Sequence, residues 1–200
     1  MSVKAVAKKI IFFVARVLNL CRKPYDLVIL DDIYPHLLSQ FRIIEYSAYL
    51  NRYRARVLTT TQAFGLIYET ASFEEVLKKY LEIYPAHEGK IVRFRPYIPV
   101  RARLFYFVFQ SNGEFFLDYI EKNRTPFVFT LYPGGGFNLK DPNSLARLRR
   151  IFASEYFREV IVTQQAVLRY LTNHRLCAPE QIHFIYGTPV NAGTLLPEIQ

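Results

Sequence analysis

Two short stretches of this sequence have the composition of a binding or catalytic site. Asp31 and Asp32 follow the apolar run 27–30, and Gly134, Gly135 and Gly136 follow the apolar run 127–131. Adjacent carboxylates can hold a divalent metal ion, but neighbouring residues at the end of a strand point in opposite directions. We therefore favour one ligand-facing acid, Asp32, beside one helix-capping acid, and predict no metal site.

The three glycines allow positive φ angles and a close approach of the backbone to a ligand. Their amides can bind an anion or the edge of a sugar; the alternative is a permissive turn between a strand and a helix. The loop lacks the Lys-Ser/Thr pair of ATPase phosphate-binding loops, and residues 33–36 (IYPH) lack the glycine fingerprint of nicotinamide and flavin enzymes. Both functions are disfavoured, and no resident cofactor is predicted.

Alternating strands and helices must position these residues. Apolar runs predict strands at 27–30, 57–60, 91–94, 104–109, 127–131, 160–162 and 182–185, and the segments between them predict helices at 36–52, 73–84, 113–122, 143–154 and 165–174. Strands that are apolar throughout are typical of a parallel sheet covered on both faces. Residues 25–191 are thus predicted to form a Rossmann-like, doubly wound α/β domain with a mainly parallel sheet.

Such sheets bind ligands at the carboxyl ends of their strands. This edge would carry Asp32, His36 and Asn112 as polar groups lining a cleft, together with the glycine loop.

Three local patterns make more specific predictions. In the helix at 36–52, the apolar residues Leu37, Phe41, Ile44 and Ala48 predict its buried face. Ser72 followed three residues later by Glu75 predicts a capping box. Ser111 is predicted to cap the helix that follows the fourth strand.

The composition excludes several classes of protein. The chain is 51% hydrophobic and 22% charged, which excludes a disordered protein. No apolar run reaches the 18 or more residues of a membrane-spanning helix. Cys21 and Cys177 are far apart and lack metal-ligand spacing, so we expect free thiols in a reducing cytoplasm.

The net charge of +9 is concentrated near the N-terminus. Residues 1–23 hold six basic and no acidic residues, which leaves 20 basic against 17 acidic residues in the remainder. Because a nucleic-acid-binding protein more often spreads its basic residues over the folded body, we predict no nucleic-acid partner. Residues 1–24 instead read as a basic amphipathic helix, which either packs on the domain or lies on an anionic membrane. Contact with the membrane would involve Lys4, Lys8, Lys9, Phe12, Phe13 and Arg16.

The order of the motifs in the last seventy residues resembles that of a known family. The motifs are Phe127–Tyr132 (FVFTLY), Val160–Thr163 (VIVT) through Tyr170-Leu171, and Gln181–Gly187 (QIHFIYG) to Val190-Asn191. They resemble the N-terminal domain of bacterial group 1 (family 4) glycosyltransferases of the GT-B fold, over most of residues 25–191. Residues 129–137 (FTLYPGGGF) also resemble a string found in members encoded in polysaccharide-biosynthesis loci.

This resemblance implies a retaining transfer from a nucleotide-sugar to a polysaccharide or lipid-linked glycan of the cell envelope. Tyr132 stands where many members have the histidine that faces the transferred sugar, so the resemblance implies a catalytic role for it near Gly134–Gly136. The glycine pair that often follows the first strand is replaced by Tyr34-Pro35-His36.

In the family, the residues that bind the donor lie mainly in a C-terminal domain, and residues 192–200 correspond to the start of the linker to it. The 200-residue chain alone is therefore expected to be inactive, and to be peripheral at the inner face of the cytoplasmic membrane. The alternative is a non-catalytic Rossmann-like binding or partner module.

Overall fold

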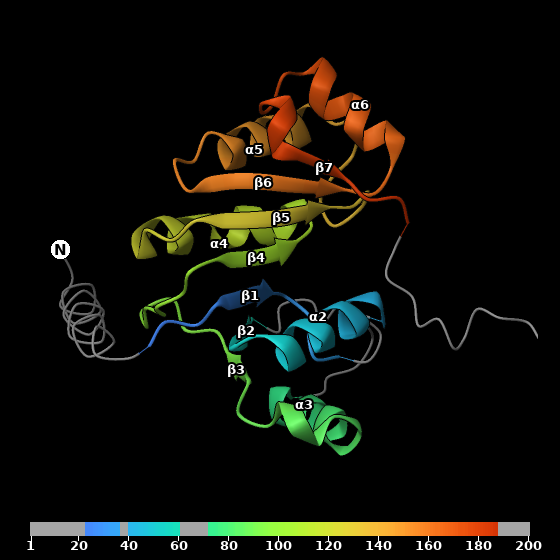
Figure 1. Ribbon diagram of the computed structural model, residues 1–200. Coiled ribbons are helices and arrows are strands. Elements are labelled where there is room, and N and C mark those ends of the chain that lie inside the picture. The colour runs from blue at the N-terminus through green and yellow to red at the C-terminus, as the bar shows by residue number, and fades with distance from the viewer. Residues whose placement is uncertain (1–22, 37–39, 61–71, 188–200) are drawn as a thin grey trace, which may run out of the picture.

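The computed structural model describes residues 23–36, 40–60 and 72–187 (Figure 1). The residues predicted to contact a membrane, and the predicted linker at 192–200, lie outside the described residues. Within the described part of the chain, no helix is both long and apolar enough to cross a lipid bilayer.

Strands and helices alternate along the described residues. The strands are β1 (Leu27–Asp31), β2 (Ala55–Thr59), β3 (Ile91–Arg93), β4 (Phe105–Val108), β5 (Phe127–Leu131), β6 (Phe157–Val162) and β7 (Ile182–Phe184). The helices are α2 (Gln40–Arg52), α3 (Phe73–Ile83), α4 (Gln110–Asn123), α5 (Pro142–Phe152) and α6 (Gln165–Asn173), with short 3₁₀ turns η3 (Pro85–His87) and η4 (Pro179–Gln181).

The seven strands form one sheet in the order β3-β2-β1-β4-β5-β6-β7 (Figure 1). All neighbouring strands pair in parallel, so their carboxyl ends share one edge. The chain builds the sheet outward from β1 in one direction and then from β4 in the other, so the direction reverses between β1 and β4. The predicted doubly wound α/β fold is confirmed, and crevices at such a reversal are where these folds bind ligands.

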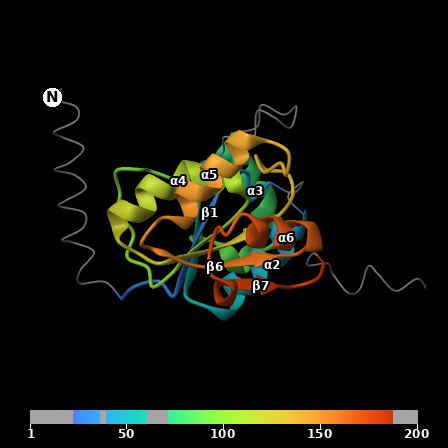
Figure 2. The ribbon, with the colours of Figure 1, turned by 90° about the horizontal axis from the view of Figure 1, so that it is seen from above.

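Helices cover the two faces of the sheet unequally. On one face α4, α5 and α6 pack over a core rich in phenylalanine, in which the rings of Phe107 and Phe129 stack 5.1 Å apart between centroids. On the other face α2 and α3 bury Tyr46 and Tyr80 against β1 and β2. Figure 1 shows α2 in front of the sheet and α4 and α5 behind it. Figure 2 shows α4 and α5 together on one side of the sheet.

Local sequence signals set some of the helix ends correctly. The Ser72 hydroxyl accepts a hydrogen bond from the Glu75 amide and the Glu75 carboxylate accepts one from the Ser72 amide, which confirms the predicted capping box. The predicted Ser111 cap is wrong, because α4 already begins at Gln110. Phe109, with φ of 71°, precedes its first turn.

The predicted buried face of α2 is also wrong. Ile44 is 37% exposed and Ala48 is exposed, whereas Arg42 and Tyr46 are buried. Leu37 lies outside the described residues, and Phe41 is partly buried. The helix turns its polar residues inward because two carboxylates at the end of β1 pair with Arg42.

Candidate functional site at the carboxyl edge of the sheet

A buried ion-pair network occupies the point where the strand order reverses. Nη1 of Arg42 lies 2.7 Å from Oδ1 of Asp31 and 2.8 Å from Oδ1 of Asp32. The other Asp31 oxygen accepts a hydrogen bond from the Tyr46 hydroxyl at 2.8 Å. Burial alone would lower the pKa of Arg42, but the neighbouring carboxylates, Asp31 foremost, raise it above its ordinary value. The guanidinium therefore remains charged.

The two adjacent carboxylates differ in exposure. The Asp31 side chain is fully buried and also accepts the backbone amides of Ile33 and Tyr34, at 2.9 and 2.8 Å. The Asp32 side chain is 24% exposed. Both reach the same nitrogen of Arg42, so the predicted opposite directions are wrong. Asp31 fixes the turn after β1, and Asp32 is the acid that remains accessible.

Asn112 and His36 lie beside this network. Asn112 on α4 donates to the Val108 carbonyl at 3.0 Å and to Asp32 Oδ1 at 3.3 Å, and its side chain is buried. His36 is buried after the turn that follows β1, and its amide donates to the Ile33 carbonyl. Sequence and structure thus agree in placing Asp32, His36 and Asn112 at this edge, although Asn112 is largely used within the protein.

An aromatic cluster separates this network from the end of β5. The ring of Phe41 lies 5.0 Å from that of Tyr132 and 6.0 Å from that of Phe109, between centroids. The Arg42 guanidinium lies 4.8 Å from the centre of the Phe109 ring, within the range of a cation–π contact. The aromatic cluster therefore shields the ion pairs from water on this side.

The glycine loop is hydrogen-bonded to residues of α4 and α5. The Gly135 carbonyl accepts the amide of Ser111, and the Gly136 carbonyl accepts Nη2 of Arg147 at 3.1 Å. A Cβ on Gly135 would come within 2.3 Å of the Phe109 ring, whereas one on Gly134 would meet nothing within 4 Å. Gly135 is thus required for packing, and Gly134 is the open position of the loop.

A pocket of about 300 Å³ opens at the carboxyl ends of β5, β6 and β7, beside α2. We call it the edge pocket. Most of its lining surface is apolar, and the residues that line it are Glu45, Tyr49, Thr130, Tyr132, Ile161, Thr163, Ile185, Tyr186 and Gly187. Tyr132 therefore lines the same pocket as residues of α2 and β6.

Glu45 is the distinctive residue of the edge pocket. Its Oε1 accepts hydrogen bonds from the hydroxyls of Tyr106 and of Tyr49, the latter at 3.1 Å. Its Oε2 is buried and has no hydrogen-bond partner among the described residues. Burial raises the pKa of Glu45 above its ordinary value, and the hydrogen bonds from Tyr106 and Tyr49 offset part of this effect. A buried carboxyl group with a raised pKa is a recurrent feature of functional sites.

Burial and the nearby Glu45 carboxylate raise the pKa of Tyr132 above its ordinary value. Its phenol therefore stays protonated at neutral pH, where it can donate a hydrogen bond but cannot act as a base.

Arg42 and Glu45 are site residues that were not predicted from the sequence. The available signal was a polar stripe, because Arg42, Glu45, Tyr46 and Tyr49 recur at three- and four-residue steps and so share one face of a helix. The apolar residues Phe41, Ile44 and Ala48 lie on another face of the same helix. A prediction from hydrophobicity alone selects that face as the buried one, and it is wrong. Among the described residues, no group of three or more His, Cys, Asp or Glu side chains is placed to hold a metal ion.

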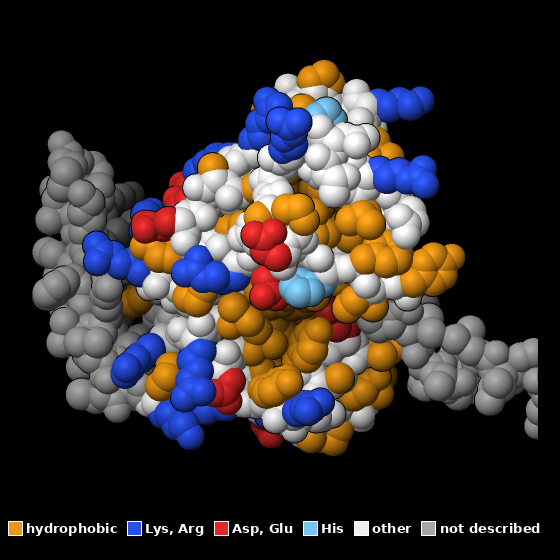
Figure 3. Space-filling view, turned by 45° about the horizontal axis from the view of Figure 1, so that its top comes forward, with side chains coloured by type: hydrophobic (Ala, Val, Ile, Leu, Met, Phe, Trp, Pro, Cys, Tyr) orange, Lys and Arg blue, Asp and Glu red, His pale blue; other side chains and the backbone are white. Residues whose placement is uncertain are grey.

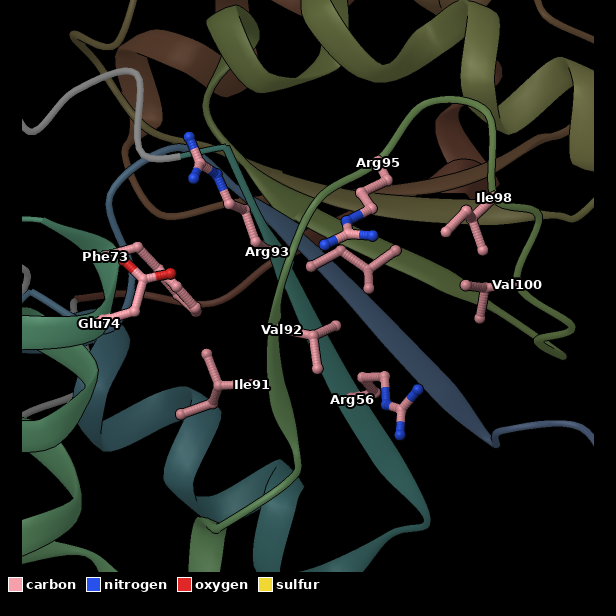
Figure 4. Close-up of a pocket in the computed structure, with 10 residues that line it drawn as sticks. Arg56, Phe73, Glu74, Ile91, Val92, Arg93, Arg95, Ile98 and Val100 are labelled. Atoms are coloured by element: carbon pink, nitrogen blue, oxygen red, sulfur yellow. The ribbon is translucent and has the colours of Figure 1, made fainter. Parts of the chain in front are cut away.

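A second pocket, of about 470 Å³, lies beside β2 and β3 and contains three arginines, Arg56, Arg93 and Arg95 (Figure 4). The labelled guanidinium groups point in different directions, and Glu74 joins them in the lining. They do not converge on one ligand position.

No protein-family model matches the sequence, and no curated protein is significantly similar to it. Only the geometry of the site and the motifs of the sequence therefore bear on the function.

Proposed function

We propose that the chain is the acceptor-binding half of a retaining glycosyltransferase, which transfers a sugar from a nucleotide-sugar to a polysaccharide or lipid-linked glycan. The donor would be bound mainly by a C-terminal donor domain, so the chain by itself would be inactive. No resident cofactor is needed for this reaction.

The observation that carries the proposal is the composition and position of the edge pocket. Hydroxyls from Thr130, Tyr132 and Thr163 and the carboxyl group of Glu45 line a concave site at the carboxyl edge of a doubly wound sheet. This lining sets a few polar groups among aromatic rings on a largely apolar surface, which suits a sugar ring that has both an apolar face and hydroxyl groups. Tyr132, the residue that the family resemblance favours for catalysis, belongs to this pocket.

The protonated Tyr132 phenol fits a role in positioning a substrate oxygen by hydrogen bonding. The glycine loop, through the open Gly134, and the accessible Asp32 would line the outer part of the cleft. The basic segment at residues 1–24 would hold the enzyme at the inner face of the cytoplasmic membrane, where lipid-linked acceptors are found.

The direct test uses the complete gene product that contains this chain. The purified protein would be incubated with individual nucleotide-sugars and with membrane extract as acceptor, and release of the nucleoside diphosphate would be measured. Acceptor-dependent release that falls at least tenfold in Tyr132→Phe and Glu45→Gln is expected. Tyr156→Phe is the matched control, because Tyr156 immediately precedes β6 and so lies at the opposite edge of the sheet.

Absence of release with every donor, from a protein shown to be folded, would overturn the proposal. The fold would then serve a non-catalytic binding or partner module. One observation favours that second function: both carboxylates at the reversal of the strand order are engaged by Arg42 rather than free for chemistry.

A further inference from the structure

An open groove of about 360 Å³ runs beside α2 and shares Tyr49 and Ile161 with the edge pocket. We call it the α2 groove. Its lining is mainly apolar and combines Leu27, Leu104, Val128 and Ile161 with three tyrosines and the acids Asp26 and Glu159. Figure 3 shows hydrophobic side chains gathered in a central hollow of the molecule, with acidic side chains beside it.

The α2 groove lies where the described helices leave the sheet uncovered. On this face α2 and α3 pack on β1 and β2. On β6, Val160 and Val162 are fully buried on the opposite face, which α4, α5 and α6 cover, whereas Ile161 between them is partly exposed in the groove. Val128 on β5 is partly exposed in the same way. Parallel sheets are almost always covered on both faces, so the floor of the groove requires a covering layer.

The chain leaves the described residues at one end of this groove. The Tyr25 amide donates to the Arg101 carbonyl and the Tyr25 carbonyl accepts the Arg103 amide, both at 2.9 Å. Asp26 and Leu27 follow directly and line the groove. Residues 23–24 alone separate segment 1–22 from this fixed point, and two extended residues span about 7 Å. Segment 1–22 therefore starts within reach of the groove.

The sequence of segment 1–22 predicts a helix that suits the floor of the groove. Apolar residues recur at three- and four-residue steps and form one stripe: Val3, Val6, Ile10, Phe13, Val14 and Val17. A helix over residues 3–18 would be about 24 Å long. The six-residue strand β6 is about 20 Å long. One helix can thus cover the groove along the length of the strands, and burial of its stripe would stabilise the domain.

Charge favours the α2 groove over the arginine-containing pocket beside β2 and β3. Segment 1–22 has five basic and no acidic residues. The described lining of the groove holds two acids and no lysine or arginine, whereas the other pocket holds three arginines and one glutamate. Asp26 and Glu159 face Arg103 and His183 at 3.6 and 3.0 Å, but these pairs are exposed and therefore weak. Both acids remain able to attract a basic segment.

We propose that segment 1–22 of this chain docks in the α2 groove as a helix, with its apolar stripe on Val128 and Ile161. Because the chain re-enters the sheet at the start of β1, this helix would run antiparallel to the strands. Lys8 and Phe12 lie on the opposite side of the predicted helix and would face outward, so docking is compatible with contact between that side and an anionic membrane. The inference concerns how the sheet is completed and does not depend on sugar transfer.

The test is the paramagnetic broadening of methyl NMR signals in the full 200-residue chain. Lys9, beside the apolar stripe, is replaced by cysteine and carries a nitroxide. Cys21→Ala and Cys177→Ala leave this as the single labelled position. The isoleucine and valine methyl groups are isotope-labelled, and the same sample with the nitroxide reduced is the reference. The reference spectrum also shows whether each variant is folded.

Docking predicts broadening on one face of the sheet. The methyl signals of Val128 and Ile161 are expected to lose at least half of their intensity in a dilute sample. Those of Ile120 on α4 and Val167 on α6, which are buried on the opposite face, are expected to keep most of theirs.

A matched pair of substitutions within the segment tests the role of the stripe. Ile10→Gln, in the middle of the stripe, should at least halve the broadening of Ile161. Ala15→Gln, off the stripe, should leave it unchanged. Both positions lie in the segment itself, so neither substitution alters the described floor of the groove.

Three results would overturn the inference. No broadening, or equal broadening on both faces, would show that the segment does not occupy the groove; binding of the same chain to vesicles of phosphatidylcholine and phosphatidylglycerol would then assign the stripe to a membrane. Broadening seen only between nitroxide-bearing and isotope-labelled chains in a mixture would show that a second copy covers the groove. Unchanged broadening in Ile10→Gln would show that the apolar stripe does not make the contact.

Discussion

The ion pair at the reversal of the strand order gives the sharpest prediction about stability. Replacing Arg42 by Met keeps an unbranched stem beside the Phe109 ring but removes the charge that faces Asp31 and Asp32. Removing one partner of a buried ion pair usually costs about 3–5 kcal/mol, because the other charge is left buried. The loss would be a large part of a typical folding stability of about 5–15 kcal/mol.

The structure places the expected cost at the lower end of that range. Asp31 would keep three hydrogen bonds, from the amides of Ile33 and Tyr34 and from the Tyr46 hydroxyl. The partly exposed Asp32 would gain water as a replacement partner. We therefore expect Arg42→Met to lower the free energy of unfolding by about 3 kcal/mol, a shift of about 1.5 M in the urea midpoint for a slope of about 2 kcal/mol per molar.

Urea unfolding, followed by both circular dichroism and tyrosine fluorescence, measures this difference. Arg150→Met is the matched control, because Arg150 pairs with Asp118 at the surface and both side chains are more than half exposed. Exposed pairs contribute about 0–1 kcal/mol. If Arg42→Met were no more destabilising than Arg150→Met, the buried network would not stabilise the end of β1, and the pairing with Asp31 and Asp32 would not be the reason that α2 turns Arg42 inward.

Three further predictions follow from buried groups and from the glycine loop. Burial raises the pKa of Glu45 above its ordinary value of 4.5, so the folded state holds this proton more tightly than the unfolded chain. As pH rises from 4.5 through the folded pKa, wild type should lose stability relative to Glu45→Gln, and urea midpoints at stepped pH test this. Burial, and then Lys90, lower the pKa of His87 below 6.5, so wild type should lose stability as pH falls from 6.5 through the folded pKa. His87→Gln should remove that part of the pH dependence; equal slopes in the two proteins would contradict it. Both Gly134→Ala and Gly135→Ala place alanine at positive φ, which costs about 1–2 kcal/mol. Gly135→Ala should cost about 1–3 kcal/mol more, because its Cβ would meet the Phe109 ring, and thermal unfolding of the pair gives the difference.

Much of the fold could be predicted from the order of apolar runs. All seven strands occur within three residues of their predicted bounds, because a strand buried on both faces reads as a continuous apolar run whatever its neighbours are. Asp32, His36, Asn112 and the glycine loop all follow the ends of predicted strands. Because parallel strands end at the same edge of the sheet, the predicted topology also placed them at the carboxyl edge. The capping box at Ser72 was also predictable, because both of its hydrogen bonds are local.

The composition of the site depended on tertiary contacts. One residue of helix rotation is about 100°, so the side of α2 that faces the sheet is decided by small differences in free energy. The face of α2 that carries Phe41, Ile44 and Ala48 is not the buried one, because Arg42 on another face pairs with two carboxylates at the end of β1. Periodicity within the helix cannot predict this contact with a separate element. Glu45 consequently entered the edge pocket.

The sequence by itself thus determined the sheet, its carboxyl edge and the polar groups carried by the strand ends, because these follow from the burial of each segment. Only the tertiary structure decided that Asp31 and Asp32 share Arg42, that Gly135 makes room for Phe109, and that an open groove runs beside α2. Each of these depends on side chains from separate elements meeting in space, and their pairing energies are set by distance and burial rather than by spacing along the chain.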